Sequence, residues 1–155
     1  MITKPNRVIC GDSYRTLKKI PQEFINLCYL DPPFFSNRIY ETVSKNGKIN
    51  SFDDRWNHDF ESYVDYMKNV LTECHRVLKK SGSLYLHCDW HASHYLKIEL
   101  DKIFGRRNFR NEIVWRRHNA HNDTKQGSKS FGRVHDVILF YSKSKDYIWN
   151  PMYQA

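Results

Sequence analysis

The sequence lacks any apolar run long enough to cross a membrane, and it has no internal repeats. Its first residues, Met1–Asn6, contain no apolar signal region, so we expect a cytoplasmic protein rather than a membrane or secreted one. The composition, 40% hydrophobic and 27% charged over 155 residues, is that of a globular protein with no second domain. A chain of this length can bury a real core.

Cysteine is also sparse, and no pair of the four cysteines has the spacing of a zinc finger. Three of the four lie in apolar contexts, which predicts small buried side chains. The segment His87–His91 contains side chains that can bind metals. It straddles the expected end of a strand, where successive side chains point in opposite directions, so we predict no metal site.

Acidic residues are scarce in one window of the chain. Between Arg106 and Arg133, eight basic residues are opposed only by Glu112 and Asp123, which gives this window a net charge of +6 out of +8 for the whole chain. Such a basic window is typical of a surface that binds a polyanion, although an ordinary solvated face is the alternative. We identify five candidate DNA-binding residues in it: Arg116, Arg117, Lys125, Lys129 and Arg133.

Hydrophobic periodicity predicts alternating strands and helices. Strands are expected at residues 7–10, 25–30, around 85–87, at 113–115 and at 137–141, and helices over 14–20, 60–80 and 91–104. In the helix over 60–80, Asp59 is the expected N-cap, and Lys79, Lys80 and Gly82 suit the C-terminal end. Mobile loops are expected at about 36–58, around the Asn46-Gly47 turn signal, and at 118–133.

The tetrapeptide Asp31-Pro32-Pro33-Phe34 follows the strand expected at 25–30, at the strand end where open α/β sheets bind ligands. Two successive prolines fix their own φ angles and bias the preceding residue toward an extended conformation. The tetrapeptide thus forms a stiff turn that offers a carboxylate, carbonyl oxygens and an aromatic ring. An amine-bearing planar ring could stack on Phe34 and donate to these oxygens. The alternative is a turn that merely ends a strand.

With this tetrapeptide the chain resembles the DNA amino-methyltransferases, which make N6-methyladenine or N4-methylcytosine and carry Asp-Pro-Pro-Tyr/Phe as their signature. The likeness continues in family order through Gly11-Asp12 and Arg76–His87, and then through Phe104-Gly105, Phe109–Trp115 and His135–Tyr141. It matches the N-terminal half of those members whose catalytic motif precedes the main cofactor motif. The resemblance implies an α/β fold: a partial Rossmann-like methyltransferase sheet, mostly parallel with one antiparallel strand, flanked by helices.

The resemblance also implies the chemistry. A methyl group would pass from S-adenosyl-L-methionine to an amino group of a base in double-stranded DNA, with Asp31, Pro32, Pro33 and Phe34 at the reacting centre. Gly11, Asp12 and Asp31 would bind the cofactor, although Asp12 alone also suits a helix N-cap. An aspartate rather than a serine at position 31 favours adenine N6 over cytosine N4.

The sequence departs from the family in one respect. It has only six glycines and lacks both the downstream Asp-Pro-Phe-x-Gly-x-Gly segment and the Thr-Gln-Lys-Pro-like segment. We therefore expect residues 1–155 to form a single, incomplete catalytic half, completed by a second half or by a homo-oligomer. The missing strands would lie between strand 7–10 and strand 25–30, leaving an apolar edge. The alternative is an inactive nucleic-acid-binding module.

Overall fold

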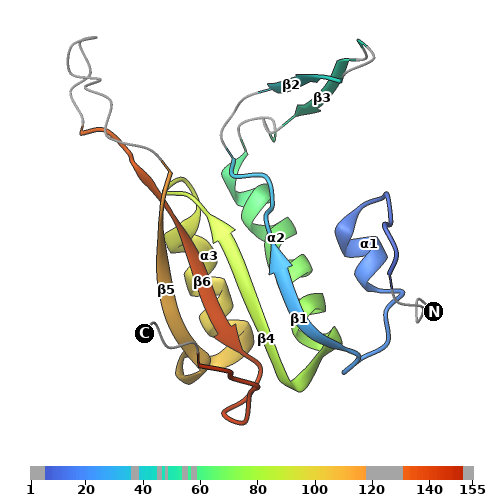
Figure 1. Cartoon of the computed structure of the whole chain (residues 1–155), viewed down its shortest axis with the longest axis vertical. Helices are drawn as coiled ribbons and strands as arrows, with labels where there is room; N and C mark the ends of the chain where they lie inside the picture. The colour runs from blue at the N-terminus through green and yellow to red at the C-terminus, as the bar shows by residue number, and fades with distance from the viewer. Residues whose placement is uncertain are drawn as a thin grey trace.

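The computed structural model describes residues 6–35, 39–44, 47, 49–53, 56, 59–117 and 131–151. Within these ranges, a four-stranded sheet, a separate two-stranded hairpin and three α-helices follow one another along the chain (Figure 1). The elements are α1 (Ser13–Leu17), β1 (Ile25–Leu30), β2 (Ile39–Val43), β3 (Ile49–Asp53), α2 (Phe60–Val77), β4 (Leu78–Cys88), α3 (Ser93–Leu100), β5 (Phe109–Arg116) and β6 (His135–Ser142).

The strands of the main sheet lie in the order β1-β4-β6-β5. β1 pairs with β4 in parallel, whereas β6 runs antiparallel to both of its neighbours, β4 and β5. Three strands therefore run in one direction and β6 opposes them. This arrangement confirms the predicted sheet, mostly parallel with one antiparallel strand.

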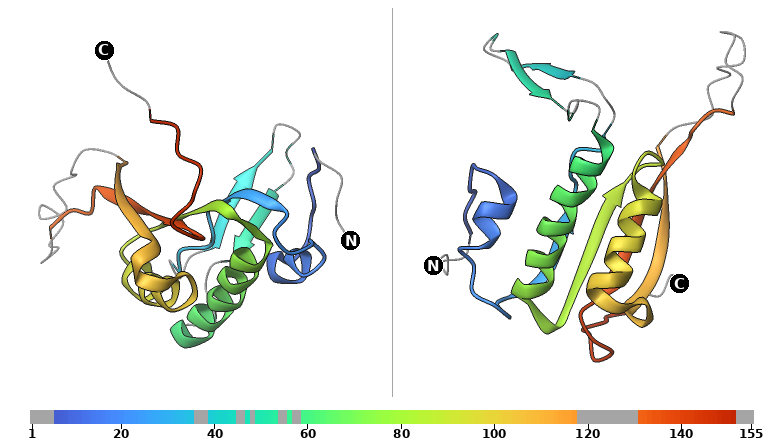
Figure 2. Two further views of the ribbon diagram at one scale, coloured as in Figure 1. Left: turned by 90° about the horizontal axis from the view of Figure 1, so that it is seen from below. Right: turned by 180° about the vertical axis from the view of Figure 1, so that it is seen from behind.

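Helices α2 and α3 cover the same face of this sheet (Figure 2). The apolar stripe predicted for residues 60–80 is buried there, and Leu84 and Leu86 of β4 meet it from the sheet. α2 begins where predicted, because the Asp59 carboxylate accepts a hydrogen bond from the Ser62 backbone N–H at 3.1 Å. Among the described residues, no helix is both long and apolar enough to cross a bilayer.

The predicted C-terminal end of the helix over 60–80 is wrong. α2 ends at Val77, and β4 begins at the next residue, Leu78, whose backbone is already extended. Lys79, Lys80 and Gly82 belong to the strand. Basic residues near a glycine suit a helix end, but pairing of this segment with β1 extends the strand backward to Leu78.

The strand predicted at residues 7–10 is also absent. These residues have no regular structure, and Val8 is fully exposed. A strand needs a neighbour for its backbone hydrogen bonds, and no described strand lies beside this segment. The following helix, expected over 14–20, is the shorter α1.

The loop predicted over 36–58 contains the paired strands β2 and β3, so that interpretation is wrong there. Its turn is confirmed at Gly47, whose N–H donates to the Ser44 carbonyl at 2.8 Å and whose φ is +76°. The predicted loop at 118–133 falls outside the described residues as far as residue 130. Residues 131–134 have no regular structure.

The helix predicted over 91–104 is divided. α3 is followed by a π-helical turn, η2 (Asp101–Gly105), and a 3-10 turn, η3 (Arg106–Asn108). Leu96, Leu100 and Phe104 are buried as expected, but Tyr95 is exposed.

Candidate functional site

The ends of three strands meet at one edge of the main sheet. In the parallel pair, Leu30 of β1 lies opposite Leu86 of β4, so Asp31 comes beside His87. In the antiparallel pair, Val137 of β6 lies opposite Cys88, so Asp136 reaches the same edge from the other direction. This is the edge at which open α/β sheets bind ligands.

The Asp-Pro-Pro turn is held from below by α2. The Tyr63 hydroxyl donates to the Pro33 carbonyl at 2.7 Å, and Phe35 is buried against the rings of Phe60 and Tyr63. The Asp31 side chain stays 64% exposed. The turn is therefore rigid and presents the Asp31 carboxylate and the adjoining Pro32 carbonyl as two oxygen acceptors.

A cavity of about 480 Å³ lies between this turn, α1 and α2. It brings together Asp12 and Asp31, two of the three residues predicted to bind a cofactor; Gly11 precedes Asp12 but does not line the cavity. The other lining residues are mostly aromatic or apolar: Ser13, Tyr29, Leu30, Pro32, Pro33, Trp56, Tyr66, Met67 and Val70. A planar, partly polar molecule would find carboxylates and apolar walls in the same cavity.

Asp12 serves as a helix cap and lines the cavity at the same time. Its carboxylate accepts from the backbone N–H of Arg15 at 2.8 Å and from the Tyr66 hydroxyl at 2.9 Å. These two hydrogen bonds lower the pKa of the Asp12 carboxyl, the one from Arg15 most. The carboxylate thus stays ionised. The two interpretations of Asp12, cap and ligand, are compatible.

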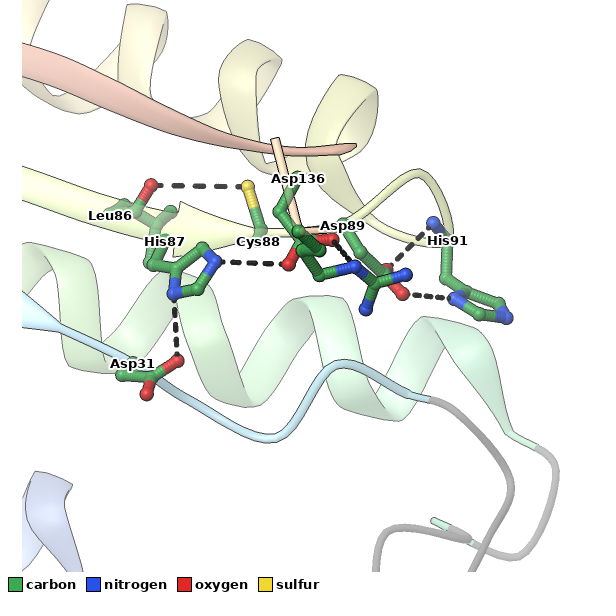
Figure 3. A network of polar contacts seen from close by, with 8 residues as sticks. Asp31, Leu86, His87, Cys88, Asp89, His91 and Asp136 are labelled. Carbon is green, nitrogen blue, oxygen red and sulfur yellow. Dashed lines mark hydrogen bonds and ion pairs between the residues drawn. The ribbon is translucent and has the colours of Figure 1, made fainter. Parts of the chain in front are cut away.

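Sequence reasoning missed the partner of Asp31 on the opposite side of the turn. His87 Nδ1 lies 3.2 Å from Asp31 Oδ1, and His87 Nε2 lies 3.3 Å from Asp136 Oδ2 (Figure 3). Phe34 packs edge-on against the His87 ring, with ring centroids 5.1 Å apart. The available signal was that His87 and Asp136, like Asp31, occur where apolar strands begin or end.

The predicted DNA-binding residues are placed in part. Arg116 ends β5 and is exposed; Arg117 follows it, with its Nε 3.3 Å from Asp136 Oδ1. The exposed Arg133 lies 3.7 Å above the ring of Trp90, another exposed residue, in a cation–π contact. Lys125 and Lys129 lie outside the described residues. The three placed arginines belong to the β5–β6 end that adjoins the Asp31 edge.

The metal-capable segment after β4 makes a different contact. The Asp89 carboxylate lies 2.7 Å from His91 Nδ1 and also accepts from the His91 backbone N–H at 3.0 Å. No group of three or more potential metal ligands occurs among the described residues. Burial raises the pKa of the Cys88 thiol to about 12, so this thiol stays protonated and apolar.

Comparison with known proteins identifies relatives of the whole arrangement. The sequence model of a family described as DNA methylase matches residues 25–154. The chain is 33% identical over 148 residues to the type II methyltransferase M.EcaI of Enterobacter cloacae, covering 94% of this chain and 31% of that protein. It is 31% identical over 144 residues to the DNA adenine methyltransferase YhdJ of Escherichia coli K12, covering 92% and 43%. The chain thus spans less than half the length of these relatives.

Solved structures share the fold. A DNA modification methylase of Thermus thermophilus, TTHA0409, superposes with a TM-score of 0.62 at 17% identity, covering 91% of this chain and 54% of that one. The cytosine-N4-specific PvuII DNA methyltransferase gives a TM-score of 0.59 at 16% identity, covering 88% and 48%.

Proposed function

This chain belongs to the N6/N4 DNA methylase family, and from that premise we propose that it carries the catalytic half of a DNA methyltransferase. The enzyme would transfer a methyl group from S-adenosyl-L-methionine to N6 of adenine in double-stranded DNA, in the cytoplasm. The observation that carries the proposal is the rigid turn that presents the Asp31 carboxylate and the Pro32 carbonyl beside a cavity lined by Asp12.

The turn suits a reaction at an exocyclic amino group. The lone pair of such a nitrogen is delocalised into the base ring, so the free amine is a poor nucleophile. Two fixed acceptors, the Asp31 carboxylate and the Pro32 carbonyl, would accept its two N–H groups and favour a pyramidal nitrogen with a localised lone pair. Preorganised acceptors of this kind contribute most of the rate gain in such reactions. Phe34 would face the base after its removal from the duplex.

The cavity fits the adenosyl part of S-adenosyl-L-methionine. Asp12 has an ionised carboxylate that can accept hydrogen bonds from hydroxyl or amino groups, and the rings of Trp56 and Tyr66 lie together at 5.2 Å on the cavity wall. Asp31 adds a negative charge that suits a sulfonium cation. When bound, the cofactor supplies the methyl group; the residues of this chain bind it and orient the acceptor amine.

The exposed cations fit a DNA duplex. Arg116, Arg117 and Arg133 lie at the end of the β5–β6 pair, next to the Asp31 edge, so phosphates held there would bring a base toward the turn. Adenine is preferred to cytosine because Asp, rather than Ser, stands at position 31, and because YhdJ, at 31% identity, is named an adenine methyltransferase. The same turn could serve cytosine N4, and the product analysis below distinguishes the two.

Tritiated-methyl transfer to DNA tests the proposal, with the chain alone and with the protein encoded immediately downstream. We expect incorporation as N6-methyladenine, detected after DNA digestion and chromatography. Asp31→Ala should lower turnover by about 100-fold or more, because a preorganised acceptor is removed. The matched control is Asp146→Ala, which removes an exposed carboxylate distant in sequence from the turn and should leave turnover unchanged.

Unchanged turnover in Asp31→Ala, at an unchanged melting temperature, would remove Asp31 from the reaction. N4-methylcytosine as the product would reassign the base. DNA binding without any incorporation, in either arrangement, would favour the inactive nucleic-acid-binding module.

A further inference from the structure

His87 stands between two carboxylates that differ sharply in their exposure to solvent. Its ring is 18% exposed; Asp31 on the Nδ1 side is 64% exposed, whereas Asp136 on the Nε2 side is only 3% exposed. Figure 3 shows the imidazole bridging the two side chains. One end of this chain of contacts is therefore open to a substrate and the other is buried in the sheet.

The three side chains meet because of strand register and not because of nearby sequence. Tyr29 lies opposite Tyr85 in the parallel pair, so the alternation of side chains puts Asp31 and His87 on one face of the sheet. His87 lies opposite Ile138 in the antiparallel pair, which puts Asp136 on that same face. The face is the one opposite to α2 and α3.

The buried carboxylate is arranged to fix the tautomer of the imidazole. A neutral imidazole carries one N–H, and an ionised carboxylate can only accept. A carboxylate with 3% exposure needs donors, and Asp136 has His87 Nε2 on one oxygen and Arg117 Nε, 3.3 Å away, on the other. The N–H of neutral His87 therefore belongs on Nε2. This leaves the lone pair of Nδ1 directed at Asp31 Oδ1.

We propose that His87 is a positioning residue for Asp31 that also takes up the proton released by methyl transfer. The inference rests on the proposed function. As the S–CH3 bond breaks and the N–CH3 bond forms, the sulfonium becomes a neutral thioether and the amino nitrogen becomes a cation. That nitrogen loses one proton to the Asp31 carboxylate, and Asp31 passes it to His87 Nδ1. The resulting imidazolium has an N–H directed at each carboxylate.

The surroundings of the ring suit this role. Imidazole is a stronger base than a carboxylate, so the transfer from Asp31 to His87 runs downhill. The imidazolium is then flanked by Asp31 and Asp136, which offset its charge. The edge of Phe34 holds the ring in place, while the partial exposure of His87 allows the proton to leave to water. The logic is that of a carboxylate that orients a histidine general base.

The first arm of the test needs no cofactor. Nitrogen-15 NMR of the labelled chain, with the His87 signals assigned through His87→Gln, reports which nitrogen carries the proton. We expect the Nε2–H tautomer when the ring is neutral. Asp136→Asn should change that tautomer, because its amide can donate to Nε2. An Nδ1–H tautomer, a ring protonated throughout, or a spectrum unaffected by Asp136→Asn would overturn the inference.

The second arm uses the active enzyme. His87→Gln should lower kcat on the order of 100-fold, with KM for DNA and cofactor little changed, because proton uptake and not binding is removed. The control is His94→Gln, an exposed histidine of α3. Full kcat in His87→Gln beside an active wild type would overturn the inference alone. A wild type without activity would instead remove the proposed function, whatever the tautomer.

Discussion

Gly82 occupies a position in β4 where the chain has no room for a side chain. An added Cβ would lie 2.9 Å from Leu78 Cδ2, 3.0 Å from the Lys79 carbonyl oxygen and 3.1 Å from the Asn26 carbonyl oxygen. Two of these neighbours are backbone atoms, which cannot turn away. The glycine thus permits the close approach of β1 at the start of the parallel pair, which in turn sets the register that brings Asp31 beside His87.

Gly82→Ala should therefore destabilise the fold by about 1–3 kcal/mol, the usual cost of inserting a methyl group into a packed site. Thermal unfolding followed by circular dichroism measures the effect. Lys80→Ala, at an exposed position of the same strand, is the control and should unfold near the wild-type temperature. Equal melting temperatures for the two variants would contradict this account of Gly82.

At the scale of elements, local sequence predicted what local physics decides. The α2 stripe from Tyr63 to Cys74 and the Asp59 cap were predicted because helical period and capping depend on near neighbours. The boundary at Leu78 and the absence of a strand around Val8 were not predicted. Both depend on whether a strand finds a partner, and that partner is distant in the sequence.

The candidate site divides in the same way. Asp31 and its turn are recognisable because the tetrapeptide is contiguous. His87 and Asp136 are 49 residues apart, and their contact exists only through the register of β4 with β6. Sequence analysis saw His87 as part of a metal-capable segment, because nothing in the segment itself points to Asp31 or Asp136.

The β5–β6 end is the element we expect to contact DNA phosphates. Charge removal by the double variant Arg116→Ala/Arg133→Ala should flatten the salt dependence of DNA binding, by about 0.9 in log–log slope for each phosphate that is no longer neutralised. Fluorescence anisotropy over a salt series measures this slope. The double variant Lys79→Ala/Lys80→Ala removes two exposed cations at the opposite end of β4 and is the control. The same slope in both variants would mean that the arginines form only a solvated surface.

At the scale of the whole molecule, β1 is the weak side of the sheet. It pairs with β4 on one side, and no described strand pairs with it on the other. Leu27 and Tyr29 are each 55% exposed there. A long apolar edge strand of this kind readily pairs with another chain. This geometry agrees with the edge expected from the sequence.

We expect the purified chain to self-associate through this edge. Leu27→Lys should reduce the association, because a charge on an open edge opposes strand pairing. Light scattering over a range of protein concentrations measures it. Ile98→Lys changes a similarly exposed residue of α3 and should have no such effect. A wild-type chain that stays monomeric at all concentrations would contradict the prediction.

The junction of α2 with β4 at Val77 and Leu78 has a consequence for motion. With no residue between them, helix and strand cannot hinge against each other, so the α2 wall of the cavity and the His87 end of β4 move as one body. α1 buries no residue and is held to α2 mainly by hydrogen bonds from Tyr66 and Arg76. Opening of the cavity should therefore be a displacement of α1, and amide hydrogen exchange should be fast in α1 and slow in α2 and β4.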